Sequence, residues 1–250
     1  RDVAVTGVQT CALPIFLLES ENLQRAGETY SGKSTGTLSI AATHTQTRYV
    51  LPRVVQKFRD VFPGVRIALQ QSAPEHIAEW VLSGKADIGI ATEGLSRFDG
   101  LVSFPCYEWH HVIVVPEGHA LTSLNTLELH HLAEYSLITY DLGFTGRSHI
   151  DDAFRHKGIE PDVVLTAMDS DVIQQYVSLG LGVGIVASMA AEHLPEGLQA
   201  ITANHLFATN VTRVAVRRGA FLREYAVDFI RELAPRLSLD ELAKAVSWRK

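Results

Sequence analysis

From residue 37 to residue 92, short apolar runs alternate with stretches in which apolar residues recur at the helical period. The runs at 37–43, 65–71 and 86–92 have the length and character of buried strands. The stretches at 45–61 and 74–84 place their apolar residues on one face of a helix. Strands that alternate with helices in this way predict parallel pairing with right-handed crossovers. This part of the chain is therefore predicted to form one βαβαβ unit.

The same order recurs in the second half of the chain. Strands are predicted at 135–140, 161–167 and 182–188, and helices at 147–158 and 169–180. In both halves the second helix ends at a glycine, and the third strand contains a Gly-Ile pair. Repetition of one supersecondary unit indicates a structural duplication. The predicted fold class is α/β, with two Rossmann-like βαβ lobes joined by a hinge.

Two segments are placed to connect the lobes. Residues 101–119 are long enough to run from the first lobe to the second, and a predicted strand at 212–218 returns. The expected lobe I comprises residues 36–108 and 211–250, and the expected lobe II comprises residues 109–210. Two crossings make a hinge with a cleft, and ligands favour clefts at the carboxyl ends of parallel strands.

The C-terminal part is expected to complete lobe I. A helix over 220–233 has one apolar face, which we expect to pack on that lobe. This face consists of Leu222, Ala226, Phe229 and Leu233. Ser238 and Glu241 have the spacing of a capping box, which predicts one more short helix.

The N-terminal part differs in character from the rest. Residues 1–16 lack the order of regions found in a signal peptide, and VTGVQTCALPI within them resembles a translated sequencing adapter, so we expect this segment to be non-native. Residues 17–35 are polar and are expected to be a linker-helix remnant and linker. Residues 27–34 match the phosphate-loop pattern G-x-x-x-x-G-K-S. That mechanism needs a strand before the loop and a helix after it, whereas here the order is reversed, so we interpret the match as chance.

Charge and cysteine content narrow the function classes. The net charge is −6 and the isoelectric point is near 6.0, with the basic residues scattered, which argues against a nucleic-acid surface on this part of the protein. The two cysteines, Cys11 and Cys106, are too few for a disulfide scaffold, and Cys106 is expected to be a buried small hydrophobe. This fits a cytoplasmic protein. No apolar run approaches the ~20 residues that span a bilayer, so no membrane partner is expected.

Uncharged polar residues follow the predicted strand ends. Thr43, Thr45 and Gln46 come after the first strand, Thr92 ends the third, and Thr145 precedes the first helix of lobe II. Hydroxyl and amide donors, together with the free N–H groups of helix N-termini, favour a small anion such as sulfate, carboxylate or phosphate. The sequence therefore predicts an anion site in the cleft.

Several of these residues have an alternative role. A threonine at a helix start commonly caps the helix, which contributes about 1 kcal/mol, so capping and binding stay equally open for Thr43, Thr45 and Thr145. Thr92 fits a capping role less well than these three threonines do.

Four neighbouring residues also have two roles open to them. For Asp169, the position at a helix start favours a capping role over a ligand contact. Arg48 and Arg147 either reach the anion or, more commonly for such residues, form surface ion pairs. Trp109 either walls the cleft or packs the hinge.

Catalytic and cofactor motifs do not emerge. The sequence has no G-x-S-x-G elbow between a predicted strand and a predicted helix, and it has no H-E-x-x-H pair. The adjacent pairs His110-His111 and His130-His131 would point to opposite faces of a strand, which is poor geometry for one metal. The run GLGVG at 180–184 lacks the dinucleotide-binding spacing and precedes a strand. We therefore expect no enzyme activity, no cofactor and no metal.

Five segments resemble the cysteine-regulon activators of the LysR family of transcription regulators. They are ATHTQTRYVLP (42–52), IATE (90–93), PCYEW (105–109), TYDLGFTGRS (139–148) and DSDVIQQYVSLGLGVGIVASMA (169–190). The similarity runs from about residue 31 to the C-terminus. HTQ with GFTGR is typical of this branch, whereas LGLGVGIV is shared by much of the family.

The resemblance implies a fold like the type 2 periplasmic binding proteins and an effector site in the cleft. The implied effector is sulfate, thiosulfate, acetylserine or adenylyl sulfate. The implied contacts are Thr43, Thr45, Gln46, Thr92 and Thr145, with Trp109 nearby. Ala42 and Thr47 differ from the residues expected beside HTQ, which leaves the choice of effector open.

The resemblance also implies partners for the whole protein. Promoter DNA is bound through an N-terminal winged helix-turn-helix that this sequence does not contain, and subunits associate as dimers and tetramers. The alternative function is a solute-binding protein of a sulfate-type importer. That alternative needs a signal peptide or a lipid anchor, and the helical stretch at 17–30 argues against it.

Overall fold

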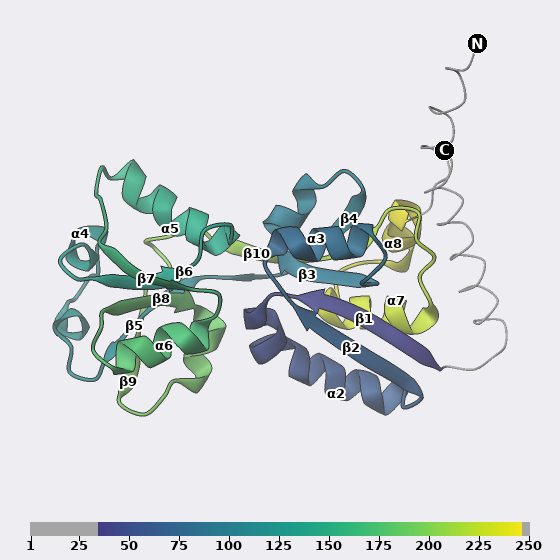
Figure 1. Ribbon diagram of the computed structural model, residues 1–250, viewed down its shortest axis with the longest axis horizontal. Coiled ribbons are helices and arrows are strands. Elements are labelled where there is room, and N and C mark those ends of the chain that lie inside the picture. The colour runs from purple at the N-terminus through teal and green to yellow at the C-terminus, as the bar shows by residue number, and fades with distance from the viewer. Residues whose placement is uncertain (1–34, 247–250) are drawn as a thin grey trace, which may run out of the picture.

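The structure, a computed structural model, describes residues 35–246 as two sheets with helices packed on them (Figure 1). Each sheet has five strands, and the two lie side by side along the long axis of the molecule. The predictions for residues 1–34, namely the non-native segment, the linker helix and the chance phosphate-loop match, lie outside the described residues. Within residues 35–246 no helix has both the length and the apolar character that a membrane span requires.

Lobe I is built on the sheet β2-β1-β3-β10-β4. Its strands are β1 (Gly36–Ala42), β2 (Val65–Gln71), β3 (Ile88–Thr92), β4 (Leu101–Trp109) and β10 (Asn210–Arg217). Its helices are the π-helix η1 (Gln46–Val50), α2 (Leu51–Val61), α3 (Pro74–Leu82), the 3₁₀-helix η2 (Glu93–Arg97), α7 (Glu224–Leu233) and α8 (Leu239–Val246). β1 runs parallel to β2 and β3, whereas β10 is antiparallel to β3 and β4.

Lobe II repeats this plan with the sheet β7-β6-β8-β5-β9. Its strands are β5 (His111–Pro116), β6 (Leu137–Tyr140), β7 (Val163–Ala167), β8 (Val183–Ala187) and β9 (Leu198–Thr202). Its helices are η3 (Ala120–Ser123), α4 (Leu129–Leu132), α5 (Thr145–His156), α6 (Ser170–Ser178) and η4 (Ser188–His193). β6 runs parallel to β7 and β8, whereas β5 is antiparallel to β8 and β9.

The predicted duplication is confirmed by this topology, because β1, β2 and β3 have the same order and direction as β6, β7 and β8. The parallel pairing predicted within each unit is confirmed, but each complete sheet is mixed. Each sheet accepts one antiparallel strand from a crossing segment, β10 in lobe I and β5 in lobe II. Such pairing joins residues that are far apart in the sequence, so the local apolar pattern carries no sign of it.

Both lobes also bring a helix unusually close to the third strand. A Cβ atom on Gly89 would lie 2.8 Å from Cγ2 of Val81 in α3, and one on Gly184 would lie 2.8 Å from Cγ2 of Val177 in α6. A larger residue at either position would force the helix away from the sheet. The matching distances are a second sign of duplication.

The C-terminal helices complete lobe I as predicted. α7 and α2 cover one face of the sheet, where the rings of Phe229 and Phe58 meet edge to face with centroids 5.5 Å apart. Ala226 and Leu233 are buried in the same cluster, and Leu222 packs against it.

The capping box before α8 is confirmed by two reciprocal hydrogen bonds. The backbone N–H of Glu241 donates to Ser238 Oγ at 3.1 Å, and the backbone N–H of Ser238 donates to Glu241 Oε2 at 3.0 Å. Two groups at the helix start are satisfied in this way.

Cys106 lies in β4, partly buried against the core of lobe I. Burial raises the pKa of its thiol to about 12. The thiol therefore stays protonated near neutral pH, as expected for a small hydrophobe rather than a nucleophile.

The two crossings lie next to each other at the hinge. β4 ends at Trp109 in lobe I, and β5 begins at His111 in lobe II. Asn210, the first residue of β10, pairs with Trp109 across the strands, and its Nδ2 lies 3.5 Å from Nδ1 of His111. Residues 109–111 and Asn210 therefore form one compact joint.

Candidate functional site

The helix predicted at 45–61 is present as one unbroken helical run over residues 44–61, but its first part is not a regular α-helix. The π-helix η1 precedes α2, and Pro52 lies in the first turn of α2, where its missing N–H costs nothing. The carbonyl of Thr43 accepts hydrogen bonds from the backbone N–H and the hydroxyl of Thr47, both at 3.1 Å. A π turn is wider than an α turn and is frequent at functional sites.

Three of the predicted threonines lie at helix starts without capping them through their hydroxyls. Thr45 and Thr92 occupy the N-cap positions of η1 and η2, and neither makes a side-chain cap hydrogen bond. Thr145 is the first residue of α5, whose N-cap is Phe144. Asp169 does cap α6, because its Oδ1 accepts from the N–H of Val172 at 2.8 Å, which confirms the prediction for this residue. Capping is therefore not the role of the three threonine hydroxyls.

Two of the threonines meet across the lobes. The Thr92 hydroxyl of lobe I donates to Thr145 Oγ1 of lobe II at 2.7 Å. Gly94 lies beside this pair, and a Cβ there would come within 3.2 Å of Thr145 Oγ1. The ends of β3 and the start of α5, which are 53 residues apart in the chain, thus form one contact.

Thr45 also reaches lobe II, at Tyr140. The Tyr140 hydroxyl lies 2.7 Å from Ser170 Oγ and accepts from the N–H of Ala187 at 2.8 Å. Burial raises the pKa of Tyr140. The hydrogen bonds with Ser170 and Ala187, and a further one with Thr45, act in the opposite direction and lower it. Tyr140 was not among the predicted site residues, although it ends a predicted strand and the same strand-end argument applies to it.

Gln46 is 1% exposed and faces its own lobe. Its side-chain oxygen accepts a hydrogen bond from the hydroxyl of Tyr107 in β4. Burial raises the pKa of Tyr107, so this hydroxyl remains a donor. The bond fixes the orientation of the Gln46 amide and makes its NH₂ group the end that can face an acceptor.

Trp109 packs the hinge. Its Nε1 donates to Thr212 Oγ1 at 3.1 Å, and its ring lies edge to face with His111 at 5.2 Å between centroids. A Cβ on Gly146, at the start of α5, would lie 3.3 Å from the Trp109 ring. The indole therefore supports the N-terminus of α5 while one side of it also lines an inter-lobe cavity.

Two cavities open between the lobes. The larger, of about 380 Å³, is lined by Tyr49, Arg53, Tyr107 and Trp109 of lobe I and by Ser188, Met189 and Glu192 of lobe II. The smaller, of about 190 Å³, is lined by Pro74, Glu75, Gly94, Arg97 and Phe98 of lobe I and by Gly143, Thr145 and Ser148 of lobe II. Of the six predicted residues, Trp109 lines the first and Thr145 the second.

The two arginines that the sequence placed near the site, Arg48 and Arg147, are already paired. Arg147 Nε lies 2.7 Å from Asp151, and its NH1 donates to the carbonyl of Tyr140. Arg48 Nε lies 3.3 Å from Asp171. Both follow the ion-pair alternative, whereas Arg53 lines the larger cavity and Arg97 the smaller.

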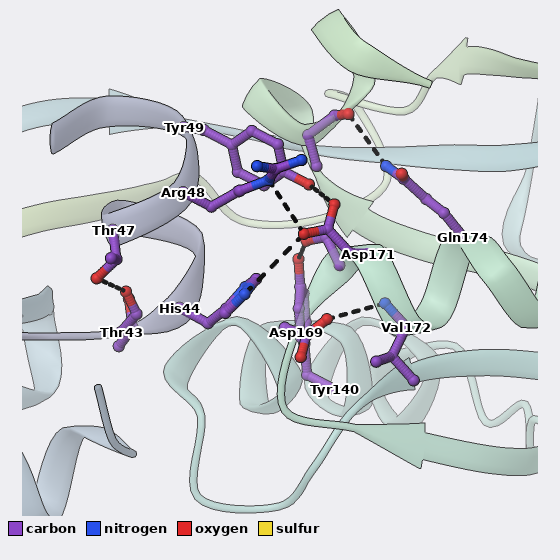
Figure 2. Close-up of polar contacts among 12 residues, drawn as sticks. Thr43, His44, Thr47, Arg48, Tyr49, Tyr140, Asp169, Asp171, Val172 and Gln174 are labelled. Carbon is purple, nitrogen blue, oxygen red and sulfur yellow. Dashed lines mark hydrogen bonds and ion pairs between the residues drawn. The ribbon is translucent and has the colours of Figure 1, made fainter. Parts of the chain in front are cut away.

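One group of potential metal ligands occurs in the described part of the chain. Nitrogen and oxygen atoms of His44, Asp169 and Asp171 lie within 4.8 Å of one another. Asp169 caps α6 and Asp171 pairs with Arg48 (Figure 2). A guanidinium on the same carboxylate opposes a bound cation, so this group fits a polar network better than a metal centre.

Comparisons with known proteins show the family of this chain. The family described as the LysR substrate binding domain matches residues 31–238. The chain is 52% identical over 229 residues to the HTH-type transcriptional regulator SsuR of Burkholderia cenocepacia, covering 91% of this chain and 74% of SsuR. It is 44% identical over 232 residues to the HTH-type transcriptional regulator Cbl of Escherichia coli, covering 92% of this chain and 73% of Cbl.

A solved structure gives the same result. The cofactor-binding domain of the Cbl transcriptional regulator matches with a TM-score of 0.83 and 45% identity, covering 86% of this chain and 95% of that domain. The expected α/β fold of two lobes, like the type 2 periplasmic binding proteins, is thereby confirmed. The chain belongs to the LysR family of transcription regulators, and residues 31–238 match the effector-binding domain of that family.

Proposed function

We propose that this chain senses a small oxyanion-bearing effector of sulfur metabolism in the cleft between its lobes. In the cytoplasm, the bound effector would control transcription of sulfur and cysteine genes. The observation that carries the proposal is the meeting of uncharged hydroxyls from both lobes, with Thr92 and Thr145 2.7 Å apart. LysR-type regulators bind small-molecule effectors, oligomerise and bind DNA, and they are not enzymes.

The donor set favours an oxyanion. Hydroxyls of Thr45, Thr92 and Thr145 do not cap helices, and the first amides of a helix lack intrahelical partners. Hydrogen bonds to a charged acceptor are stronger than those between neutral groups, so such donors favour a small anion. Thr43 and Gln46 belong to the same segment and complete the proposed contact set, with Trp109 supporting α5.

An effector that contacts both lobes stabilises the arrangement in which the lobes meet. A ligand shifts a conformational equilibrium only through different affinities for the two states. We propose that the shift in lobe geometry is passed to the rest of a regulator through its subunit contacts. The importer alternative is less well supported, because the relatives described above are transcriptional regulators.

We also propose that the chain associates with copies of itself. Large apolar side chains are exposed along β7, α6 and the turn after it. They are Val164, Met168, Val172, Tyr176, Leu179 and Leu181. β7 and β2 are corresponding edge strands, and Val61 and Leu69 are exposed near the β2 edge. Two copies placed head to tail would cover both edges, and sedimentation of the chain should therefore give a mass above that of the monomer.

A thermal-shift screen tests the proposed effector class. Sulfate, thiosulfate, acetylserine and adenylyl sulfate are each added at millimolar concentration, with potassium chloride at matched ionic strength as the control. A ligand at a hundred times its Kd stabilises the folded state by about 2.7 kcal/mol. This corresponds to a rise in Tm of roughly 5–10 °C for a domain of this size. A screen in which none of the four compounds raises Tm above the chloride control would contradict the proposal.

A further inference from the structure

Asp171, in the first turn of α6 in lobe II, contacts three side chains of lobe I (Figure 2). The hydroxyl of Tyr49 donates to its Oδ1 at 2.6 Å. Arg48 Nε lies 3.3 Å from its Oδ2, and His44 Nε2 lies 4.0 Å from the same oxygen. All three partners come from the segment between β1 and the start of α2.

This segment, residues 43–49, also carries Thr43, Thr45 and Gln46. It is held in a π-helical turn rather than in a regular α-helix. The π turn points Gln46 into lobe I and Tyr49 toward lobe II. Any contact that anchors Tyr49 therefore also sets the position of Thr45, which lies one helical turn away.

Tyr49 is the strongest of the three contacts. Its ring, from lobe I, packs against a hydrophobic cluster of lobe II that includes Tyr140 and Ala190. Burial and the bond to Asp171 raise the pKa of Tyr49, so the phenol stays protonated as a donor. The ion pair with Arg48 contributes less, because the Arg48 side chain is 61% exposed and solvent screens it.

We propose that Asp171 and Tyr49 form an inter-lobe latch that positions residues 43–49 for effector binding. Asp171 is a positioning residue, since it acts through Tyr49 and not through the ligand. The proposal rests on the proposed function in that it takes the cleft to be the effector site. A second contact between the lobes, Glu93 Oε1 to His149 Nε2 at 3.2 Å, shares no residue with the latch.

Tyr49→Phe tests the latch without changing any charge. Asp171→Asn removes the carboxylate that pairs with Arg48. The released guanidinium would attract an anion and mask a loss of affinity, so Asp171→Asn is tested only by the separation of the lobes and not by sulfate binding. Tyr135→Phe, in lobe II next to His119, is the matched control for the loss of a phenol hydroxyl. Asp152→Asn, on α5 beside Arg155, is the matched control for the loss of a carboxylate.

The opening of the lobes is measured on the full chain without ligand. Spin labels at Gln56→Cys on α2 and Glu192→Cys on η4, both exposed, report the separation across the larger cavity. Cys11 is replaced by serine, and Cys106 is left in place because burial raises the pKa of its thiol to about 12. Circular dichroism establishes that each variant is folded.

We expect Tyr49→Phe and Asp171→Asn each to add a population with a longer label separation, whereas both controls keep the distribution of the parent chain. Calorimetry with sulfate should show a lower affinity for Tyr49→Phe, by up to about tenfold, because the affinity falls with the fraction of chains in the closed arrangement. Unchanged distance distributions in both latch variants would overturn the proposal. If the parent chain does not bind sulfate, the proposed effector is wrong, and the ligand-free distances still decide whether the latch exists.

Discussion

Replacing Thr45 and Thr145 together by valine should lower the affinity of the chain for sulfate by about a hundredfold or more. Each hydrogen bond from a hydroxyl to a charged ligand contributes roughly 1.5–3 kcal/mol to the binding free energy, and about 1.4 kcal/mol corresponds to a factor of ten in affinity. The two residues come from different lobes and neither caps its helix, so the double variant removes ligand donors while leaving the helix starts intact. The single variants should each show a smaller loss.

Calorimetry with sulfate measures this effect, and urea unfolding measures the stability of the same variants. Thr202→Val, at the exposed end of β9, is the matched control and should bind as the parent chain does. Stability should fall by no more than about 1 kcal/mol for each hydrogen bond lost within the protein. Unchanged sulfate affinity in the double variant would remove these hydroxyls from the site.

Replacing His111 by glutamine should flatten the dependence of stability on pH below pH 6.5. His111 is fully buried at the hinge, between the rings of Trp109 and Phe207. Its Nε2 is without a hydrogen-bond partner among the described residues. Burial, with smaller contributions from His149 and His110, lowers its pKa from 6.5 to about 3.

The direction of the effect follows from proton binding in the two states. Between pH 6.5 and pH 3 the unfolded chain binds a proton at His111 and the native chain does not, so acidification favours unfolding. His111 therefore lowers the free energy of unfolding by up to about 1.4 kcal/mol for each pH unit below 6.5. Above pH 6.5 the residue is neutral in both states and causes no such loss. Acid should thus destabilise the fold through this buried histidine.

Urea unfolding at pH 7.5, 6.5, 5.5 and 4.5 measures the slope. The His111→Gln variant should lose about 1.4 kcal/mol per pH unit less than the parent chain over the acidic range. His156→Gln, exposed at the end of α5, is the control and should retain the parent slope. Equal slopes for His111→Gln and the parent chain would show that the hinge histidine takes up a proton without unfolding.

The duplicated fold was predictable because its signals are local. Apolar runs and helical spacing each lie within about ten residues, and the equivalence of the two halves follows from their order. The strand-end argument also reached Thr92 and Thr145, which meet at 2.7 Å. Parallel strands end at a common edge, so residues at those ends converge whatever the details of packing.

The remaining features depend on contacts between distant parts of the chain. The bond between Tyr49 and Asp171 joins residues 122 positions apart, and nothing in either local sequence indicates it. The π turn at 46–50 replaced a predicted regular helix, because an apolar pattern does not distinguish the two backbone hydrogen-bond registers. Trp109 was left between two roles, and the structure shows the indole bonded to Thr212 in the hinge while also lining a cavity.

Anomalous scattering from a crystal of the chain grown with selenate is the most direct test of oxyanion binding between the lobes. Selenate has the charge and tetrahedral shape of sulfate, and selenium marks its position independently of any phase model. We predict a peak within hydrogen-bond distance of the hydroxyls of Thr45 and Thr145. Ordered selenate bound elsewhere, with no peak between the two lobes, would contradict the proposed site.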